Sequence, residues 1–178
     1  MVGSANLNVM LKAARKAGRA LAKDFREVEN LQVSMKGAGD FVSRADIAAE
    51  KIIKNELMGA RPTYGWLAEE GGGEEGQDPT RRWIVDPLDG TTNFIHGFPV
   101  FAVSVALEYK DAIVLGAVYD PCRRELFLAQ KGHGATLNGS PIQVSNRRKV
   151  DEALVATAFP WREKTTLSHY LRGFNRVF

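Results

Sequence analysis

Two stretches in the N-terminal part of the chain carry apolar residues every three or four positions, which predicts two amphipathic helices. The first covers residues 7–28, and its remaining positions hold lysines and arginines that we interpret as a solvated basic face. A glycine-rich stretch at residues 37–40 predicts a loop. The second helix is predicted over residues 43–58, since Ser43 and Asp46 have the spacing of a capping box.

Short apolar segments separated by turn residues follow from Tyr64 onwards, and this pattern predicts strands. The connections between them are too short for crossover helices, so a mostly antiparallel sheet is expected. Asn138 and Gly139 form a hairpin signal, whereas the glycines and glutamates of residues 71–78 predict a flexible acidic loop. The predicted strands are residues 64–68, 82–85, 100–109, 112–119, 125–130, 134–137, 142–145 and 154–159.

A last helical stripe covers residues 167–178 and ends on the large apolar side chain of Phe178, without a glycine or a polar stop. We therefore expect further residues after Phe178. The predicted organisation is a domain of residues 1–150, which holds the helix pair and the sheet, followed by residues 151–178 as the incomplete start of a second part. These elements define an α+β fold class.

Composition excludes several classes of protein. The 178 residues include 24 Lys and Arg against 21 Asp and Glu, which gives a net charge of +3, and 44% are hydrophobic, as in an ordinary globular domain. No apolar run approaches the ~20 residues that a membrane helix needs. The single cysteine, Cys122, excludes an internal disulfide and fits a reducing compartment. We expect a cytoplasmic protein without membrane contact.

Candidate chemistry is concentrated in residues 83–94. An apolar strand reaches Asp86, and Pro87 is expected to end it because proline has no N–H and a fixed φ. The chain can then fold back so that Asp86 and Asp89 share one small volume, with the carbonyl of Leu88 between them. Two carboxylates held together repel each other, and a hard divalent cation bound through oxygen neutralises them.

The two residues after this acidic pair suit a phosphate group. Gly90 and Thr91 offer backbone N–H groups and a hydroxyl beside the metal, particularly if a helix begins there. The alternative is that Asp-Pro and Asp-Gly are turn dipeptides and nothing more. Both dipeptides within five residues, between a strand and two threonines, favour the metal site.

Residues 83–96 (WIVDPLDGTTNFIH) resemble the first signature of the inositol monophosphatase family of Mg²⁺-dependent, lithium-sensitive phosphatases. A weaker resemblance runs from the first predicted helix through residues 40–46 and 67–70 to about Ser145. The resemblance implies the first half of a layered αβαβα sugar-phosphatase sandwich. Two N-terminal helices would pack on a mostly antiparallel sheet, and the C-terminal α/β half would be missing from this chain.

The resemblance also implies a set of metal ligands, namely Glu69, Asp86, Asp89 and the carbonyl of Leu88. Two or three Mg²⁺ ions are expected, and Mn²⁺ or Ca²⁺ can substitute. Glu74 is a competing carboxylate, but it lies among glycines. Glu69 directly follows a predicted strand and is therefore held more rigidly, as a metal ligand must be.

The catalytic residues implied by the resemblance are Glu69, Thr91 and Asp46. Thr91 and Asp46 would orient and deprotonate the attacking water, and Glu69 would hold the metal that activates it. From the residues alone, Asp46 is a helix-capping residue, and the two roles are compatible because a cap is held rigidly. The implied substrate-binding residues are Glu69, Leu88, Asp89, Gly90 and Thr91.

The expected activity is Mg²⁺-dependent hydrolysis of a phosphorylated polyol, with inositol 1-phosphate first. Fructose 1,6-bisphosphate, a nucleotide 3′-phosphate and histidinol phosphate are the alternatives within the same chemistry. The family also has a later Trp-Asp motif that completes the second metal site. None of the three tryptophans here precedes an aspartate, so this ligand is expected beyond Phe178.

A different class of function is a transcription-associated protein that binds nucleic acid or RNA polymerase. Its support in the sequence is limited to basic clusters at residues 81–82, 123–124 and 147–149, which we interpret first as ordinary solvated surface. A homodimer is expected from the family resemblance.

Overall fold

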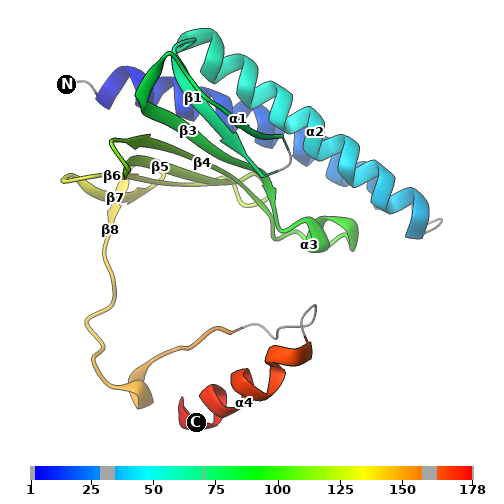
Figure 1. Cartoon of the computed structure of the whole chain (residues 1–178). Coiled ribbons are helices and arrows are strands. Elements are labelled where there is room, and N and C mark those ends of the chain that lie inside the picture. Colours follow the sequence, from blue (N-terminus) through cyan, green and yellow to red (C-terminus); the bar gives the residue numbers. More distant parts are fainter. Residues whose placement is uncertain (1–2, 29–34, 70, 158–163, 178) are drawn as a thin grey trace. The chain divides into compact units, whose positions relative to one another are not determined.

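The computed structural model describes residues 3–28, 35–69, 71–157 and 164–177 (Figure 1). The chain divides into two compact units, Met1–Ile142 and Gln143–Phe178. The first unit holds two long helices, one short helix and a sheet, and the described part of the second holds two short 3₁₀ segments and one helix. Within the described residues, no helix is long and apolar enough to cross a membrane.

Helices α1 (Gly3–Val28) and α2 (Met35–Ala60) lie side by side and pack on one face of the sheet, as Figure 1 shows. The small residues Ala13, Ala14 and Ala17 of α1 are fully buried, which lets the helix approach its neighbours closely. On the outside, Lys12 and Lys16 of α1 both pair with one α2 carboxylate, that of Glu56, at 2.8 and 2.6 Å.

The predicted start of the second helix is wrong. Helix α2 begins at Met35, so the glycine-rich stretch at residues 37–40 belongs to the helix, and Ser43 does not cap it. A glycine costs only about 1 kcal/mol inside a helix. Extending an existing helix costs less free energy than starting a new one. The long helix α2 can therefore include these glycines.

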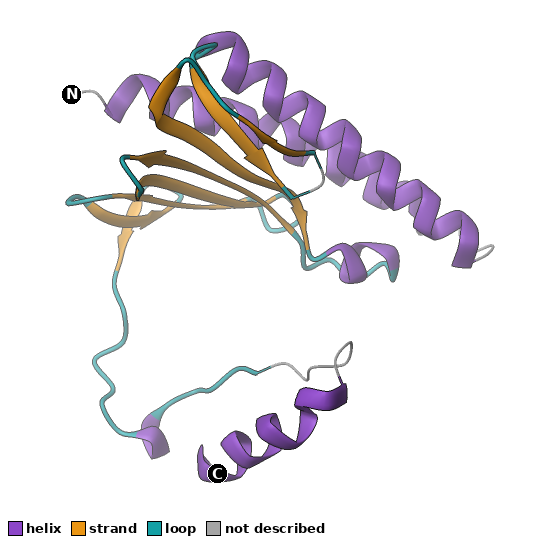
Figure 2. Cartoon of the chain, in the orientation of Figure 1, coloured by secondary structure: helices purple, strands orange, loops and turns teal. Residues whose placement is uncertain are grey.

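Eight strands form one mixed sheet in the order β2-β1-β3-β4-β5-β6-β7-β8. Figure 2 shows the strands in orange. Only β1 and β3 run parallel among the paired strands of the described residues, so the predicted mostly antiparallel sheet is confirmed. The strands are β1 (Tyr64–Ala68), β2 (Gly72–Glu74), β3 (Asp78–Asp89), β4 (Ala102–Tyr109), β5 (Ala112–Asp120), β6 (Glu125–Gln130), β7 (Gly134–Leu137) and β8 (Ser140–Ile142).

Buried and partly exposed residues alternate along the central strands, so one face of the sheet lies against the core and the other does not. In β4, Val103, Val105 and Leu107 are buried, and the residues between them are partly exposed. On the opposite face, the large apolar side chains of Val118 and Phe127 remain 40% and 38% exposed. Helices α1 and α2 therefore cover one side of the sheet, and the core of this unit lies between them and that side.

Two predictions in this sheet need correction. The glycine–glutamate stretch contains the short edge strand β2, because β1 offers it a backbone partner. Strand β8 lies at Ser140–Ile142 rather than residues 142–145, since the turn at Asn138 and Gly139 fixes its register with β7. That turn itself is confirmed, with φ of 51° and 86° at the two residues.

The second unit contains two short 3₁₀ segments, Val150–Glu152 and Lys164–Thr166, followed by α4 (Leu167–Val177). The helical stripe predicted at residues 167–178 is therefore confirmed over its described part. The strand predicted at residues 154–159 is wrong for residues 154–157, which have no regular structure, and residues 158–159 lie outside the described chain.

Candidate metal and phosphate site

The site begins with a bend near the end of β3. Asp86 pairs with Ser104 and Asp89 pairs with Ala102, so three steps along β3 match two steps along β4. This extra residue is a β-bulge, and a bulge accommodates proline because it requires no ladder hydrogen bond there. The prediction that Pro87 ends the strand is therefore wrong: β3 continues to Asp89.

Hydrogen bonding and burial hold this bend in place. The backbone N–H of Leu88 donates to Asp86 Oδ1 at 3.1 Å, which closes a turn of the kind that aspartate favours. The side chains of Pro87 and Leu88 are fully buried. The bend is therefore anchored in the core, and Asp86 and Asp89 stand on either side of a rigid Pro-Leu pair.

Glu69 lies at the same end of the strands as Asp86, because β1 and β3 are parallel and their carboxyl ends are adjacent. Ala68 pairs with Val85, and the N–H of Glu69 donates to the carbonyl of Val85 at 3.3 Å. Glu69 therefore follows β1 beside the position where Asp86 follows Val85 in β3. Parallel strands place such consecutive residues at one sheet edge.

The pKa of Asp86 reflects the proximity of Glu69 and Asp89. Its pKa is raised from 3.8 to about 6, first by burial and then by the negative charges of Glu69 and Asp89. Hydrogen bonding with Glu69 raises it further, while the N–H of Leu88 acts in the opposite direction. The charges of Glu69 and Asp89 thus act on Asp86 at the end of β3, and a proton or a cation at Asp86 relieves this repulsion.

The donor set fits a hard divalent cation, which prefers carboxylate and carbonyl oxygen. Within the described ranges, no group of three or more His, Cys, Asp or Glu side chains is already arranged around a metal position. The ligand roles of Glu69, Asp86, Leu88 and Asp89 stay predictions.

Gly90 and Thr91 begin the short helix α3 (Thr91–Ile95) directly after the acidic bend. Gly90 has a φ of 94°, and a Cβ there would lie 2.9 Å from the carbonyl oxygen of Val100, so only glycine fits. Thr91 Oγ1 donates to the carbonyl of Leu88 at 3.1 Å. That carbonyl keeps a second lone pair, and the Thr91 side chain is exposed.

Asp46 lies inside α2, about three turns after the helix begins, and it is only 6% exposed. The capping role predicted for it is therefore wrong, because a cap must stand at a helix terminus. Helix α2 contacts both β3 and α3. A buried aspartate on this helix is compatible with the catalytic role implied by the resemblance, which stays a prediction.

Sequence reasoning assigned no role to the residues that anchor α3. The Nδ2 of Asn93 donates to the carbonyl of Val100 at 2.8 Å, which closes the loop after the helix. Phe94 is fully buried, and its ring lies 5.4 Å from that of Phe25 in α1 and 4.8 Å from that of Phe101. Asn93 and Phe94 therefore hold helix α3 in place after Gly90.

Stability of the metal-free protein should depend on pH through Asp86. A carboxyl with a raised pKa in the folded state makes folding less favourable as pH rises from 3.8 through about 6. We expect Asp86→Asn to be more stable than wild type by about 1–2 kcal/mol at pH 7, after allowance for solvent screening, and equal to it near pH 4. Urea unfolding with a chelator present measures this. Parallel stability curves from pH 4 to 8 would contradict it.

A model of the inositol monophosphatase family matches residues 5–176. The chain therefore belongs to the inositol monophosphatase family.

Its relatives include an "Inositol-1-monophosphatase" of Rhizobium meliloti, 53% identical over 99% of this chain and 66% of the relative. "Nus factor SuhB" of Escherichia coli is 41% identical over 97% of this chain and 64% of that protein. The crystal structure of extragenic suppressor protein SuhB from Bartonella henselae superposes with a TM-score of 0.88 at 51% identity, over 98% of this chain and 67% of that one. The chain spans 60–66% of the length of three inositol-1-monophosphatases that it matches.

Proposed function

We propose that the chain forms the metal-binding part of a Mg²⁺-dependent phosphatase that hydrolyses inositol 1-phosphate. The observation that carries this proposal is the half-buried carboxyl of Asp86, whose pKa is raised by burial and by Glu69 and Asp89. A stable fold rarely keeps mutually repelling carboxyl groups at one sheet edge unless a ligand compensates them. Membership of the inositol monophosphatase family and the names of several relatives support the same activity.

The metal ligands of the chain would each bind one or both of two ions. Glu69, Asp86 and the carbonyl of Leu88 would hold one ion, and Asp86 together with Asp89 would hold a second. Bound Mg²⁺ supplies a lowered pKa for the attacking water and neutralises charge on the phosphate.

Phosphate would bind against the start of α3. The backbone of Gly90 and Thr91 holds its oxygens, and the hydroxyl of Thr91 orients the attacking water. Asp46 accepts the water's proton from its buried position on α2. The aspartate of the family's Trp-Asp motif is not in this chain, and it would complete the second ion site from elsewhere in the protein.

The test is phosphate release by the full-length gene product from inositol 1-phosphate, with fructose 1,6-bisphosphate, a nucleotide 3′-phosphate and histidinol phosphate as competitors. We expect turnover of inositol 1-phosphate to require Mg²⁺, to persist with Mn²⁺ and to be inhibited by lithium. Release that continues in excess chelator, or a clear preference for another of the four substrates, would overturn this assignment. A homodimer and a cytoplasmic location are further proposals, which gel filtration and fractionation test.

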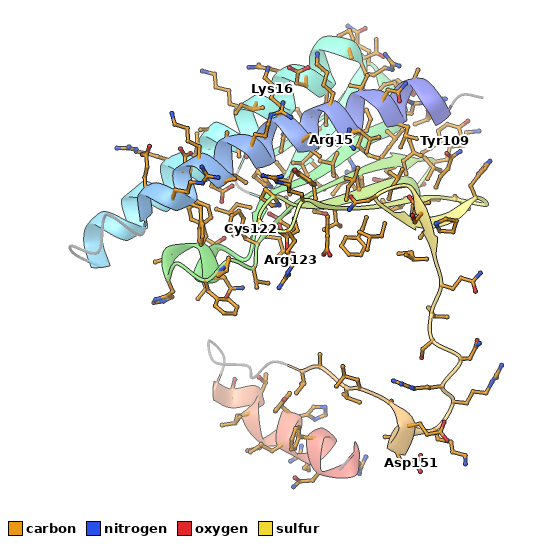
Figure 3. All side chains as sticks on the ribbon, turned by 180° about the vertical axis from the view of Figure 1, so that it is seen from behind. Arg15, Lys16, Tyr109, Cys122, Arg123 and Asp151 are labelled. Atoms are coloured by element: carbon orange, nitrogen blue, oxygen red, sulfur yellow. The ribbon has the colours of Figure 1, made fainter. Side chains whose placement is uncertain are left out.

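A second candidate function is a transcription-associated binding role, which the relatives named "Nus factor SuhB" favour. The basic residues that suggested nucleic-acid binding give it little support. Arg82 pairs with Glu108 at 2.7 Å, and Arg123, labelled with Cys122 in Figure 3, pairs with Asp120 at 3.1 Å. We therefore expect any such role to use protein contacts. Strongly salt-dependent RNA binding would contradict this expectation.

A further inference from the structure

The β1–β2 hairpin, which carries Glu69 in its turn, has a short and exposed outer strand, β2. Glu69 lies in the turn between β1 and β2, where Ala68 pairs with Gly72 and Trp66 pairs with Glu74. Strand β2 has three residues, all exposed, and it stands at the edge of the sheet. So short a strand, with glycine at two of its three positions, contributes few side-chain contacts of its own. Contacts from helix α2 are therefore expected to help hold β2 in place.

Helix α2 contacts this hairpin through Lys54. The Nζ of Lys54 forms an ion pair with Glu74 Oε1 of β2 at 2.5 Å. The same ammonium lies 5.6 Å from the ring centroid of Trp66 in β1, within the range of a cation–π interaction. Trp66 and Glu74 are directly opposite each other in the two strands. One side chain of α2 therefore binds both members of a cross-strand pair.

Glu50, one helical turn before Lys54, approaches the same hairpin at its turn. A Cβ added to Gly71 would collide with the carboxylate of Glu50, so the backbone of Gly71 lies directly against that side chain. Residues four apart share one face of a helix. Glu50 and Lys54 thus face the hairpin together, one at its turn and the other at its cross-strand pair.

We propose that Lys54 is a positioning residue for Glu69: it fixes the β1–β2 hairpin on α2 and so holds the glutamate where it meets Asp86. This inference rests on the proposed metal site. Residues that orient a metal ligand act on affinity out of proportion to their effect on overall stability. The ion pair fits that description, because Lys54 and Glu74 are 34% and 58% exposed and such a pair adds little to the stability of the whole fold.

The first experiment needs no metal. Hydrogen exchange of the protein in chelator should show amides of residues 64–69 and 71–76 exchanging about two- to fivefold faster in Lys54→Met, which keeps the apolar stem and removes the charge. Lys54→Arg should restore slow exchange, and Glu74→Gln should resemble Lys54→Met. The matched control is Lys149→Met, which breaks an exposed ion pair with Glu152 in the unit Gln143–Phe178 and should leave this hairpin unchanged. Wild-type exchange rates in Lys54→Met would overturn the inference.

The second experiment measures affinity for Mn²⁺ alone, from the free-ion signal in electron paramagnetic resonance. We expect Lys54→Met to weaken binding about three- to tenfold with a wild-type melting temperature, Lys54→Arg to recover it, and Lys149→Met to change it less than twofold. Unchanged affinity in Lys54→Met also overturns the inference. The proposed function fails separately, if the wild-type protein binds Mn²⁺ but releases no phosphate from any of the four substrates.

Discussion

Replacing Asp86 by Asn should lower Mg²⁺-dependent phosphate release by about a thousandfold and leave the fold intact. Asp86 is the carboxylate expected to contact both ions, so removal of its charge affects both. A loss of about 4 kcal/mol of transition-state stabilisation corresponds to this factor. Asparagine keeps the Oδ1 acceptor for the N–H of Leu88, so the turn that closes the bend survives.

Steady-state kinetics with saturating Mg²⁺ measure the effect, and circular dichroism checks the fold. The control is Glu75→Gln, because Glu75 is an exposed acid on the same stretch of chain, close to the site in sequence but outside it. We expect this variant to retain activity within about twofold, as is usual for an exposed substitution away from the chemistry. An active Asp86→Asn protein would remove the proposed metal mechanism.

Stability supplies an independent readout for the same variant. Mg²⁺ that binds only the folded protein raises the free energy of unfolding by mass action. Wild type should therefore gain stability on addition of Mg²⁺ at pH 7, whereas Asp86→Asn should not. Without metal the order is reversed, because the wild-type protein carries the repulsion around Asp86. The crossover distinguishes a metal site from a simple structural carboxylate.

Much of the acidic bend could be predicted from local sequence. The spacing of Asp86 and Asp89, the strand before them and the glycine after them all follow from residue chemistry within one segment. Predicting that Glu69 joins them required the family resemblance. Its proximity depends on the parallel pairing of β1 with β3, and pairing between segments separated by an acidic stretch has no local signal.

The errors have a common physical origin, which is that tertiary contacts override local preferences. Pro87 does not end β3, because a bulge accommodates it and the core buries it. Glycines do not break α2, because packing supports the long helix. Asp46 has the spacing of a cap, yet it lies in the helix interior. The role proposed for Lys54 could not be predicted from the sequence, because it rests on contacts with two strands that follow Lys54 in the chain.

The second large effect is expected for Gly90→Ala, which should destabilise the protein by about 2–4 kcal/mol. Two costs add at this position. The φ of 94° is unfavourable for any residue with a Cβ. The new Cβ would also lie 2.9 Å from the carbonyl oxygen of Val100 and 3.2 Å from the Cα of Phe101, and backbone atoms cannot move aside as a flexible side chain can.

Gly97→Ala separates these two costs. Gly97 also has a positive φ, 68°, but a Cβ there meets nothing within 4 Å. It should therefore lose only the conformational part, about 1 kcal/mol. Urea unfolding of both variants gives the steric part by difference. Because Gly90 stands between the acidic bend and Thr91, the steric displacement should also weaken Mn²⁺ binding in Gly90→Ala and not in Gly97→Ala. Equal destabilisation of the two variants would show that the approach of Val100 to Gly90 does not determine the geometry of the site.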